Sequence, residues 1–181
     1  MERNSGFLIS EEEIKSKVKE IANQIKEDYK GRNPLLVGIL KGSFIFLADL
    51  IRSLDMDLEV DFLAVSSYGK STTTSGVVKI LKDLNQPIEN RDVILVEDIV
   101  DSGLTLKYLK EMLIGRNPRS LRICVLLDKK ERREVDVKLD YVGFEVPDYF
   151  LVGYGLDFAE KYRNLPYIKA LTQEEIKEVL K

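Results

Sequence analysis

The sequence predicts an α/β protein whose mainly parallel central sheet is flanked by helices. Apolar segments of strand length alternate along the chain with segments whose apolar residues recur at helical spacing. Two of the strand-like segments, Leu35–Leu40 and Val93–Val96, are apolar throughout, as parallel strands buried on both faces are. The length of 181 residues and the hydrophobic content of 44% suit one domain, which we expect to span residues 1–181.

The first predicted helix begins at a capping box formed by Ser10 and Glu13. Apolar residues then recur at helical spacing as far as Tyr29, and Gly31 marks the end of the helix. A second capping-box pattern, Thr172 followed by Glu175, predicts a helix at the C-terminal end of the chain.

The strand Leu35–Leu40 is followed by the turn Lys41-Gly42-Ser43 and by a helix over Phe44–Leu54. Ser43 is the expected N-cap of that helix, because a serine hydroxyl can accept from the first free amides of a helix. Alternation of apolar and polar residues then predicts a strand over Leu58–Val65. The polar segment Ser66–Gly76 is expected to be a loop, and Val77–Leu81 a short strand.

The second half of the chain continues the alternation of strands and helices. The segments Val93–Val96, Leu104–Ile114 and Leu121–Leu127 predict a strand–helix–strand unit, and two short strands are expected at Tyr141–Val146 and Phe150–Val152. Ligands of such sheets bind beyond the carboxyl ends of the strands. The turn at Lys41 and the segment after Val96 should therefore share one rim.

Composition excludes several classes of chemistry. The chain contains no histidine, which excludes Ser-His and Cys-His nucleophile pairs and imidazole metal sites. Its one cysteine, Cys124, allows neither an internal disulfide nor a multi-cysteine zinc site. A general base must therefore be Asp, Glu, Lys or Tyr, and a bound metal must be a hard ion with oxygen ligands, of which Mg²⁺ is the first choice.

Charge and hydropathy limit the kinds of partner that the protein can bind. The net charge of −3 argues against nucleic-acid binding through bulk charge. No apolar run reaches the roughly 18 residues that a membrane span requires, and Met1–Ile9 lacks the apolar region of a signal peptide. We therefore expect no membrane partner and a cytoplasmic location.

The most informative segment is Glu97–Thr105, which follows the strand Val93–Val96. Its three carboxylates would be costly to bury without cations or hydrogen-bond donors. Backbone amides of the loop and of the next helix can supply donors, and Gly103 permits a positive φ there. The hydroxyls of Ser102 and Thr105 can also donate to phosphate oxygens. The segment therefore predicts acid groups for a metal or for hydroxyls, beside a seat for a phosphate.

With its preceding strand, this segment resembles the phosphoribosyl-pyrophosphate motif of type I phosphoribosyltransferases. Further matches point to the hypoxanthine-guanine branch in its bacterial type, namely Gly38–Ser43, Ser66–Gly69, Leu127–Lys129, Tyr141–Asp157 and Arg163. The similarity covers roughly residues 5 to 170 in the family's order, and the Tyr141–Asp157 run is its most specific part. The resemblance implies the type I phosphoribosyltransferase fold, with a small hood contributed by the N-terminus and about residues 136–165.

The resemblance also implies which residues bind the phosphoribosyl pyrophosphate donor. Ribose hydroxyls would be held by Glu97 and Asp98, and Mg²⁺ by the same pair and Asp157. The matched positions for the 5′-phosphate are Asp101, Ser102, Gly103, Leu104 and Thr105, with Leu104 where some relatives carry lysine. Those for pyrophosphate are Lys41, Gly42 and Arg163, the turn at Lys41 often containing a cis peptide in the family. Ser67 and Tyr68 match a loop that closes over the site.

The acceptor base would be bound by a second set of matched residues, namely Ile99, Lys129, Phe150, Leu151 and Asp157. Lys129 matches the side chain that reaches the exocyclic oxygen of the purine, Phe150 the aromatic that stacks on the base, and Leu151 the residue whose backbone recognises the purine edge. Asp101 matches the catalytic residue, a general base or acid at the purine N7.

The resemblance therefore implies an enzyme of purine salvage that transfers 5-phosphoribose to N9 of hypoxanthine, and of guanine, with Mg²⁺ as cofactor. Xanthine stays open as a preferred base, whereas the amino group of adenine gains nothing from a lysine donor. A nucleotide-sensing regulator on the same fold is a further alternative, but it should have a basic surface. The apolar helix surface at Phe44–Ile51 suggests a homodimer or homotetramer; the sequence decides neither this nor the preference between hypoxanthine and guanine.

Overall fold

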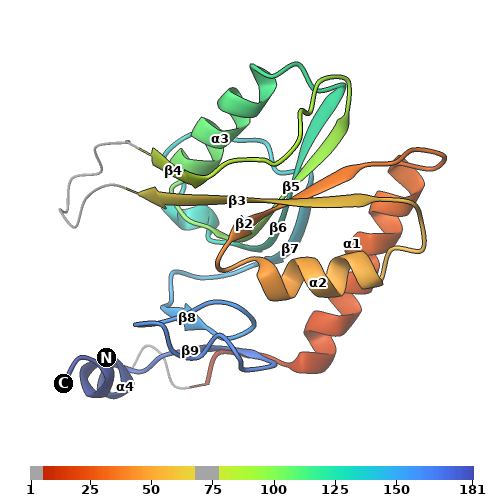
Figure 1. Ribbon diagram of the computed structural model, residues 1–181. Helices are drawn as coiled ribbons and strands as arrows, with labels where there is room; N and C mark the ends of the chain where they lie inside the picture. Colours follow the sequence, from red (N-terminus) through yellow and green to blue (C-terminus); the bar gives the residue numbers. More distant parts are fainter. Residues whose placement is uncertain (1–5, 68–77) are drawn as a thin grey trace.

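The computed structural model describes residues 6–67 and 78–181 and confirms the predicted α/β fold (Figure 1). Part of the expected loop Ser66–Gly76, including Tyr68, lies outside the described residues. The elements are β1 (Leu8–Ile9), α1 (Glu11–Asp28), β2 (Leu35–Leu40), α2 (Phe44–Arg52), β3 (Glu59–Ser67), β4 (Val78–Lys82), β5 (Asp92–Val100), α3 (Leu104–Ile114), β6 (Ser120–Asp128), the 3₁₀ turn η1 (Lys130–Arg132), β7 (Tyr141–Glu145), β8 (Leu151–Val152), β9 (Ile168–Ala170) and α4 (Gln173–Val179).

Six strands form the main sheet in the order β4-β3-β2-β5-β6-β7. All neighbours in it are parallel except β4, which runs antiparallel to β3 at one edge. The three strands β1, β9 and β8 form a second, antiparallel sheet. The carboxyl ends of β2, β5 and β6 meet at one edge of the main sheet because these strands are parallel neighbours.

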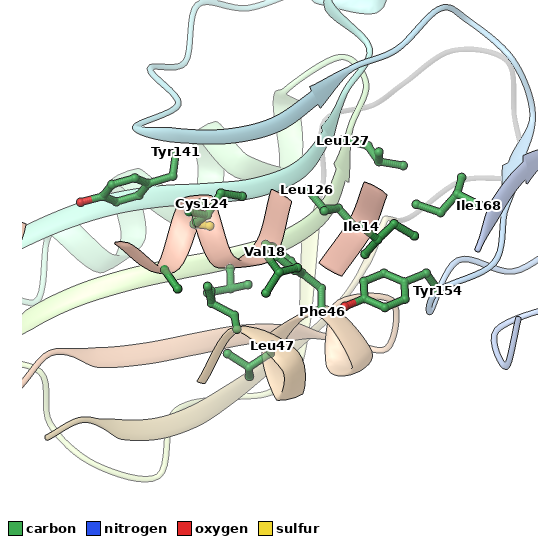
Figure 2. Close-up of a cluster of buried hydrophobic side chains, with 14 of the residues drawn as sticks. Ile14, Val18, Phe46, Leu47, Cys124, Leu126, Leu127, Tyr141, Tyr154 and Ile168 are labelled. Atoms are coloured by element: carbon green, nitrogen blue, oxygen red, sulfur yellow. The ribbon is translucent and has the colours of Figure 1, made fainter. Parts of the chain in front are cut away.

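Helices cover both faces of the main sheet, with α1 and α2 on one face and α3 on the other (Figure 1). Successive residues of a strand point to opposite faces. Within β5, Ile94 and Val96 belong to the hydrophobic cluster under α1 and α2, and Val93 and Leu95 to the cluster under α3. Figure 2 shows Ile14 and Val18 of the first cluster packed with side chains of α2 and β6. Continuous apolar strands were therefore the correct signal for a sheet buried on both faces.

The cluster under α1 and α2 continues into the second sheet, where it includes Ile9, Leu151 and Ile168. This continuity supports the proposal of one domain. The second sheet matches the expected hood only in part. The range of about 136–165 includes β7, which belongs to the main sheet, and stops before β9.

Several local predictions were wrong. Ser66 and Ser67 belong to β3 and not to the predicted loop. Two further errors lie closer to the site. The strand after Arg91 does not end at Val96, because its parallel pairing with β6 continues to Val100. Glu97 and Asp98 therefore lie on the strand and not beyond it. Ser43 does not cap α2, since its backbone is helical and its buried hydroxyl donates instead to the Ile39 carbonyl at 2.7 Å. By contrast, both capping boxes, at Ser10 and at Thr172, are present.

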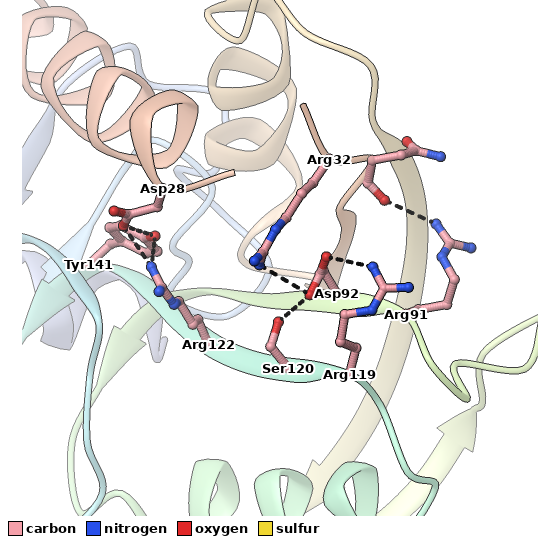
Figure 3. Close-up of polar contacts among 9 residues, drawn as sticks. Asp28, Arg32, Arg91, Asp92, Arg119, Ser120, Arg122 and Tyr141 are labelled. Carbon is pink, nitrogen blue, oxygen red and sulfur yellow. Dashed lines mark hydrogen bonds and ion pairs between the residues drawn. The ribbon is translucent and has the colours of Figure 1, made fainter. Parts of the chain in front are cut away.

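The amino ends of β5 and β6 are closed by a polar network (Figure 3). Asp92 is only 2% exposed and accepts from the Ser120 hydroxyl at 2.7 Å, with Arg119 and Arg32 at 3.4 and 3.7 Å. Burying a carboxylate is costly unless it is paired and hydrogen-bonded. The charges of this network therefore stabilise the fold, and they lie at the end of the sheet opposite the candidate site.

Among the helices of the described residues, none combines the length and the apolarity that a membrane span requires.

Candidate active site

A cavity of about 250 Å³ lies where the carboxyl edge of the main sheet faces the second sheet. It is lined by Asp98, Ile99, Asp101, Lys129, Phe150, Leu151, Leu156 and Asp157. Seven of these eight residues were predicted to bind the purine, the ribose or a metal, or to catalyse the reaction, and Leu156 was not. Residues from distant parts of the sequence thus meet at one cavity.

The turn after β2 lies against the acidic pair of β5. A Cβ added at Gly42 would overlap Oδ2 of Asp98 and lie 2.7 Å from its Cγ. The peptide bond Leu40–Lys41, at the start of this turn, is cis, in agreement with the expectation for this part of the chain. Only glycine at position 42 allows this close approach of the turn to the Asp98 carboxylate.

Glu97 and Asp98 are both half-buried carboxylates on adjacent residues of β5. Burial and the charge of the neighbouring Asp98 raise the pKa of Glu97 well above its usual range. The Asp98 amide donates to Glu97 Oε1 at 3.0 Å, and the Ile99 amide donates to Asp98 Oδ1 at 2.7 Å. Such a pair favours a cation or hydroxyl donors beside it.

The segment from Asp101 to Thr105 forms a tight turn into α3. Gly103 has φ of +84°, in the left-handed region that favours glycine, and precedes the first residue of the helix. The Leu104 amide donates to the Ser102 hydroxyl at 3.3 Å. Amides at the start of a helix lack intrahelical acceptors and attract anions. The turn is therefore compatible with the phosphate seat predicted for it.

Lys129 directly follows β6, and its ammonium lies near two carboxylates. Its ammonium lies 3.6 Å from Asp101 Oδ1 and 3.5 Å from Asp148 Oδ1. The Lys129 side chain is only 11% exposed, and its amide donates to the Val100 carbonyl at 3.0 Å. A hydrogen-bond donor and a hydrogen-bond acceptor therefore stand side by side at the cavity.

Phe150 and Leu151 form another part of the cavity wall. The rings of Phe150 and Phe158 meet edge to face, with centroids 4.9 Å apart, and Phe150 remains 44% exposed. Leu151 lies on β8, an edge strand of the second sheet. On one side of an edge strand, the backbone N–H and C=O groups are not paired with another strand of the sheet. This arrangement suits a base that stacks on the ring of Phe150 and whose edge forms hydrogen bonds with the backbone of Leu151.

The remaining charged residues gather around Glu160, which the sequence analysis did not single out. Lys41 Nζ lies 3.2 Å from Glu160 Oε2, and Arg163 Nη2 lies 3.5 Å from Glu160 Oε1. The Lys41 ammonium holds the pKa of Glu160 below its usual range. Two cations predicted to bind pyrophosphate thus converge on one carboxylate. Arg163 also donates to the Gly155 carbonyl at 2.7 Å and pairs with Asp157 at 3.1 Å.

The carboxylates at the cavity fit a Mg²⁺ ion that binds together with a substrate. Asp98 and Asp157 present carboxylates to the cavity, and carboxylate oxygen is the ligand type that Mg²⁺ prefers. Within residues 6–67 and 78–181, no three Asp, Glu, Cys or His side chains gather closely enough to hold an ion by themselves. The predicted ligands Glu97, Asp98 and Asp157 therefore do not form one cluster. Mg²⁺ usually takes one or two carboxylates and completes its shell with water and substrate phosphates.

Two further residues at the site carry contacts that sequence reasoning missed. Arg133 pairs with the buried carboxylate of Asp128 and donates to the Asp101 carbonyl at 3.3 Å, so it ties the turn to β6. Asp148 contacts Lys129. Both lie within a few residues of a predicted site residue, but only the folded geometry identifies their partners. Of the predicted closing loop, Ser67 ends β3 and Tyr68 is outside the described residues.

Comparison with known proteins gives consistent matches. The family model described as the phosphoribosyl transferase domain matches residues 9–159. The chain is 57% identical over 164 residues to hypoxanthine-guanine phosphoribosyltransferase of Bacillus subtilis, covering 91% of each chain. It is 52% identical over 171 residues to the protein of the same name from Dictyostelium discoideum, covering 92% of this chain and 95% of the relative. A crystal structure of hypoxanthine-guanine phosphoribosyltransferase from Bacillus anthracis superposes with a TM-score of 0.89 at 52% identity, covering 94% of this chain and 100% of that one.

Proposed function

The chain belongs to the phosphoribosyl transferase domain family, and from this premise we propose that it is an enzyme of purine salvage. The proposed reaction transfers 5-phosphoribose from phosphoribosyl pyrophosphate to N9 of hypoxanthine and guanine. Relatives of that name cover most of this chain at 52–57% identity. No observation favours xanthine as the base or a nucleic-acid-binding regulator.

The observation that carries the proposal is the shared cavity wall. Asp101, Lys129 and Phe150 line one cavity of about 250 Å³, between the acidic pair of β5 and the second sheet. A 6-oxopurine offers a flat face to an aromatic ring, a carbonyl oxygen to an ammonium and a ring N–H to a carboxylate. Each of these three groups has its complement in the cavity.

In the proposed reaction the bond between C1 of the ribose and the pyrophosphate oxygen breaks, and a bond from the purine N9 to C1 forms. The proton lost by the base is accepted by the Asp101 carboxylate at N7, and pyrophosphate leaves with the bonding electron pair. Lys41 and Arg163, which both pair with Glu160, are the cations proposed to meet that negative charge, and cations placed there lower the barrier. Glu97 and Asp98 would bind the ribose hydroxyls and favour positive charge on the sugar ring.

Mg²⁺ is proposed as the cofactor, with Asp98 and Asp157 as the carboxylates at the cavity and Glu97 beside them. When bound it would neutralise charge on the pyrophosphate. We further propose a cytoplasmic enzyme and a homodimer or homotetramer. Phe44 on α2 is 42% exposed, which supports a subunit contact on that helix.

A direct assay tests the proposed function. The protein is incubated with Mg²⁺, phosphoribosyl pyrophosphate and one purine base at a time, and nucleotide formation is measured by chromatography. We expect inosine and guanosine monophosphates from hypoxanthine and guanine, with much slower use of adenine. Absence of any nucleotide product with all bases would refute the proposal, and a clear preference for xanthine would correct it.

Replacing Lys129 by alanine should lower the preference for hypoxanthine over adenine by about tenfold, because one charged donor to the purine O6 is lost. The measurement is the ratio of kcat/KM for the two bases. The KM for phosphoribosyl pyrophosphate serves as the internal control and should change little. An unaltered ratio would contradict the role of Lys129 at O6.

A further inference from the structure

Asp148 stands next to the proposed purine site without lining it. Its Oδ1 lies 3.5 Å from Lys129 Nζ, and the same ammonium lies 3.6 Å from Asp101 Oδ1. Lys129 and Asp101 line the cavity, whereas Asp148 does not. The Lys129 ammonium is thus shared between a carboxylate at the reacting base and a carboxylate outside the cavity.

The Asp148 carboxylate also has a second cationic neighbour. Its Oδ2 lies 3.5 Å from Arg132 Nη1, at the end of η1. Its backbone follows Pro147, whose φ is fixed by its ring, and the Pro147 carbonyl accepts from the Tyr149 amide at 2.8 Å. Because Phe150 follows two residues later, Asp148 links the position of Lys129 to the segment that carries the aromatic wall.

We propose that Asp148 is a positioning residue for purine recognition, which holds the Lys129 ammonium toward O6 and keeps the Asp101 carboxylate available to N7–H. This inference rests on the proposed function. With Asp148 present, Lys129 retains an anionic partner when it turns from Asp101 to the purine oxygen. Without Asp148, Asp101 becomes the remaining carboxylate paired with Lys129, and the incoming base must compete with that ion pair for both groups.

The variant Asp148→Asn removes the charge and retains the shape. We expect the KM for hypoxanthine to rise about tenfold, as for the loss of one charged hydrogen bond. The KM for phosphoribosyl pyrophosphate should stay unchanged, since Asp148 lies outside the donor-binding residues. Asp148→Glu should recover most of the affinity for hypoxanthine. Glu145→Gln is the matched control, because Glu145 on β7 pairs with Lys130 at 3.9 Å, both largely exposed and away from the cavity.

A double-mutant cycle separates positioning from a general structural effect. In a Lys129→Ala background, Asp148→Asn should no longer alter the KM for hypoxanthine, because the side chain through which it acts is absent. An equal effect in both backgrounds, or no effect on the KM in the wild-type background, would overturn the inference. If Asp148→Asn does not fold, Asp148→Ser, which also removes the carboxylate next to Lys129, is put through the same cycle with the same two outcomes. A wild-type protein inactive with every base would refute the proposed function instead.

Discussion

Replacing Asp101 by alanine is expected to lower kcat with hypoxanthine by about 100- to 10,000-fold, the range of general acid–base catalysis. Asp101 is the catalytic candidate because its carboxylate lines the cavity and lies 3.6 Å from the Lys129 ammonium. A carboxylate oxygen accepts hydrogen bonds and can take up the proton that the base loses. The rate of nucleotide formation at saturating substrates measures the effect.

The fold should survive this substitution, because the Asp101 side chain is 53% exposed and such positions usually alter stability little. Thermal unfolding of the variant checks this. Asp101→Asn retains the size of the side chain and removes its basicity, so it should be nearly as slow as the alanine variant. Asp136→Asn, at an exposed carboxylate outside the cavity lining, is the matched control. Turnover of Asp101→Ala close to that of the wild type would exclude proton transfer by this residue.

Long, regular elements could be predicted because their patterns are local. The apolar spacing of α1 and the continuous apolar run of β2 each specify one element without knowledge of its neighbours. The strands β1 and β9 were missed, since segments of two and three residues show no periodicity and exist through their antiparallel pairing. The end of β5 was misplaced because two carboxylates interrupt its apolar pattern while its ladder with β6 continues.

For the candidate site, the residues that carry motifs could be predicted, but their contacts with other residues could not. The positions of Asp98, Lys129 and Phe150 at one cavity agree with expectations drawn from motifs in three parts of the chain. The partners Asp148 and Glu160 were not predicted, because a single acidic residue in a loop carries no signal of what it will meet. Their roles depend on distances across the fold, which motif matching does not give.

The close approach of Gly42 to Asp98 gives the second strong prediction. Gly42→Ala should lower kcat/KM by about 100-fold, the cost associated with a displacement of about 1 Å in a site. The added methyl group would overlap Oδ2 of Asp98, and an overlap with the end of a side chain is relieved most easily by rotating that side chain. The carboxylate proposed to hold ribose and Mg²⁺ would therefore turn away from the cavity.

Because a side-chain rotation relieves the overlap, the free energy of unfolding should fall by no more than about 1 kcal/mol, as for a typical point substitution. Gly115→Ala is the matched control. Its added Cβ would lie 3.3 Å from the Met112 carbonyl, at the end of α3 and away from the cavity. In an Asp98→Ala background the effect of Gly42→Ala should largely disappear, because the group it displaces is gone. If Gly42→Ala lowers kcat/KM as strongly in that background, the loss of activity comes from a distorted turn and not from Asp98. Wild-type kinetics of the single variant would show that the site tolerates a side chain at this position.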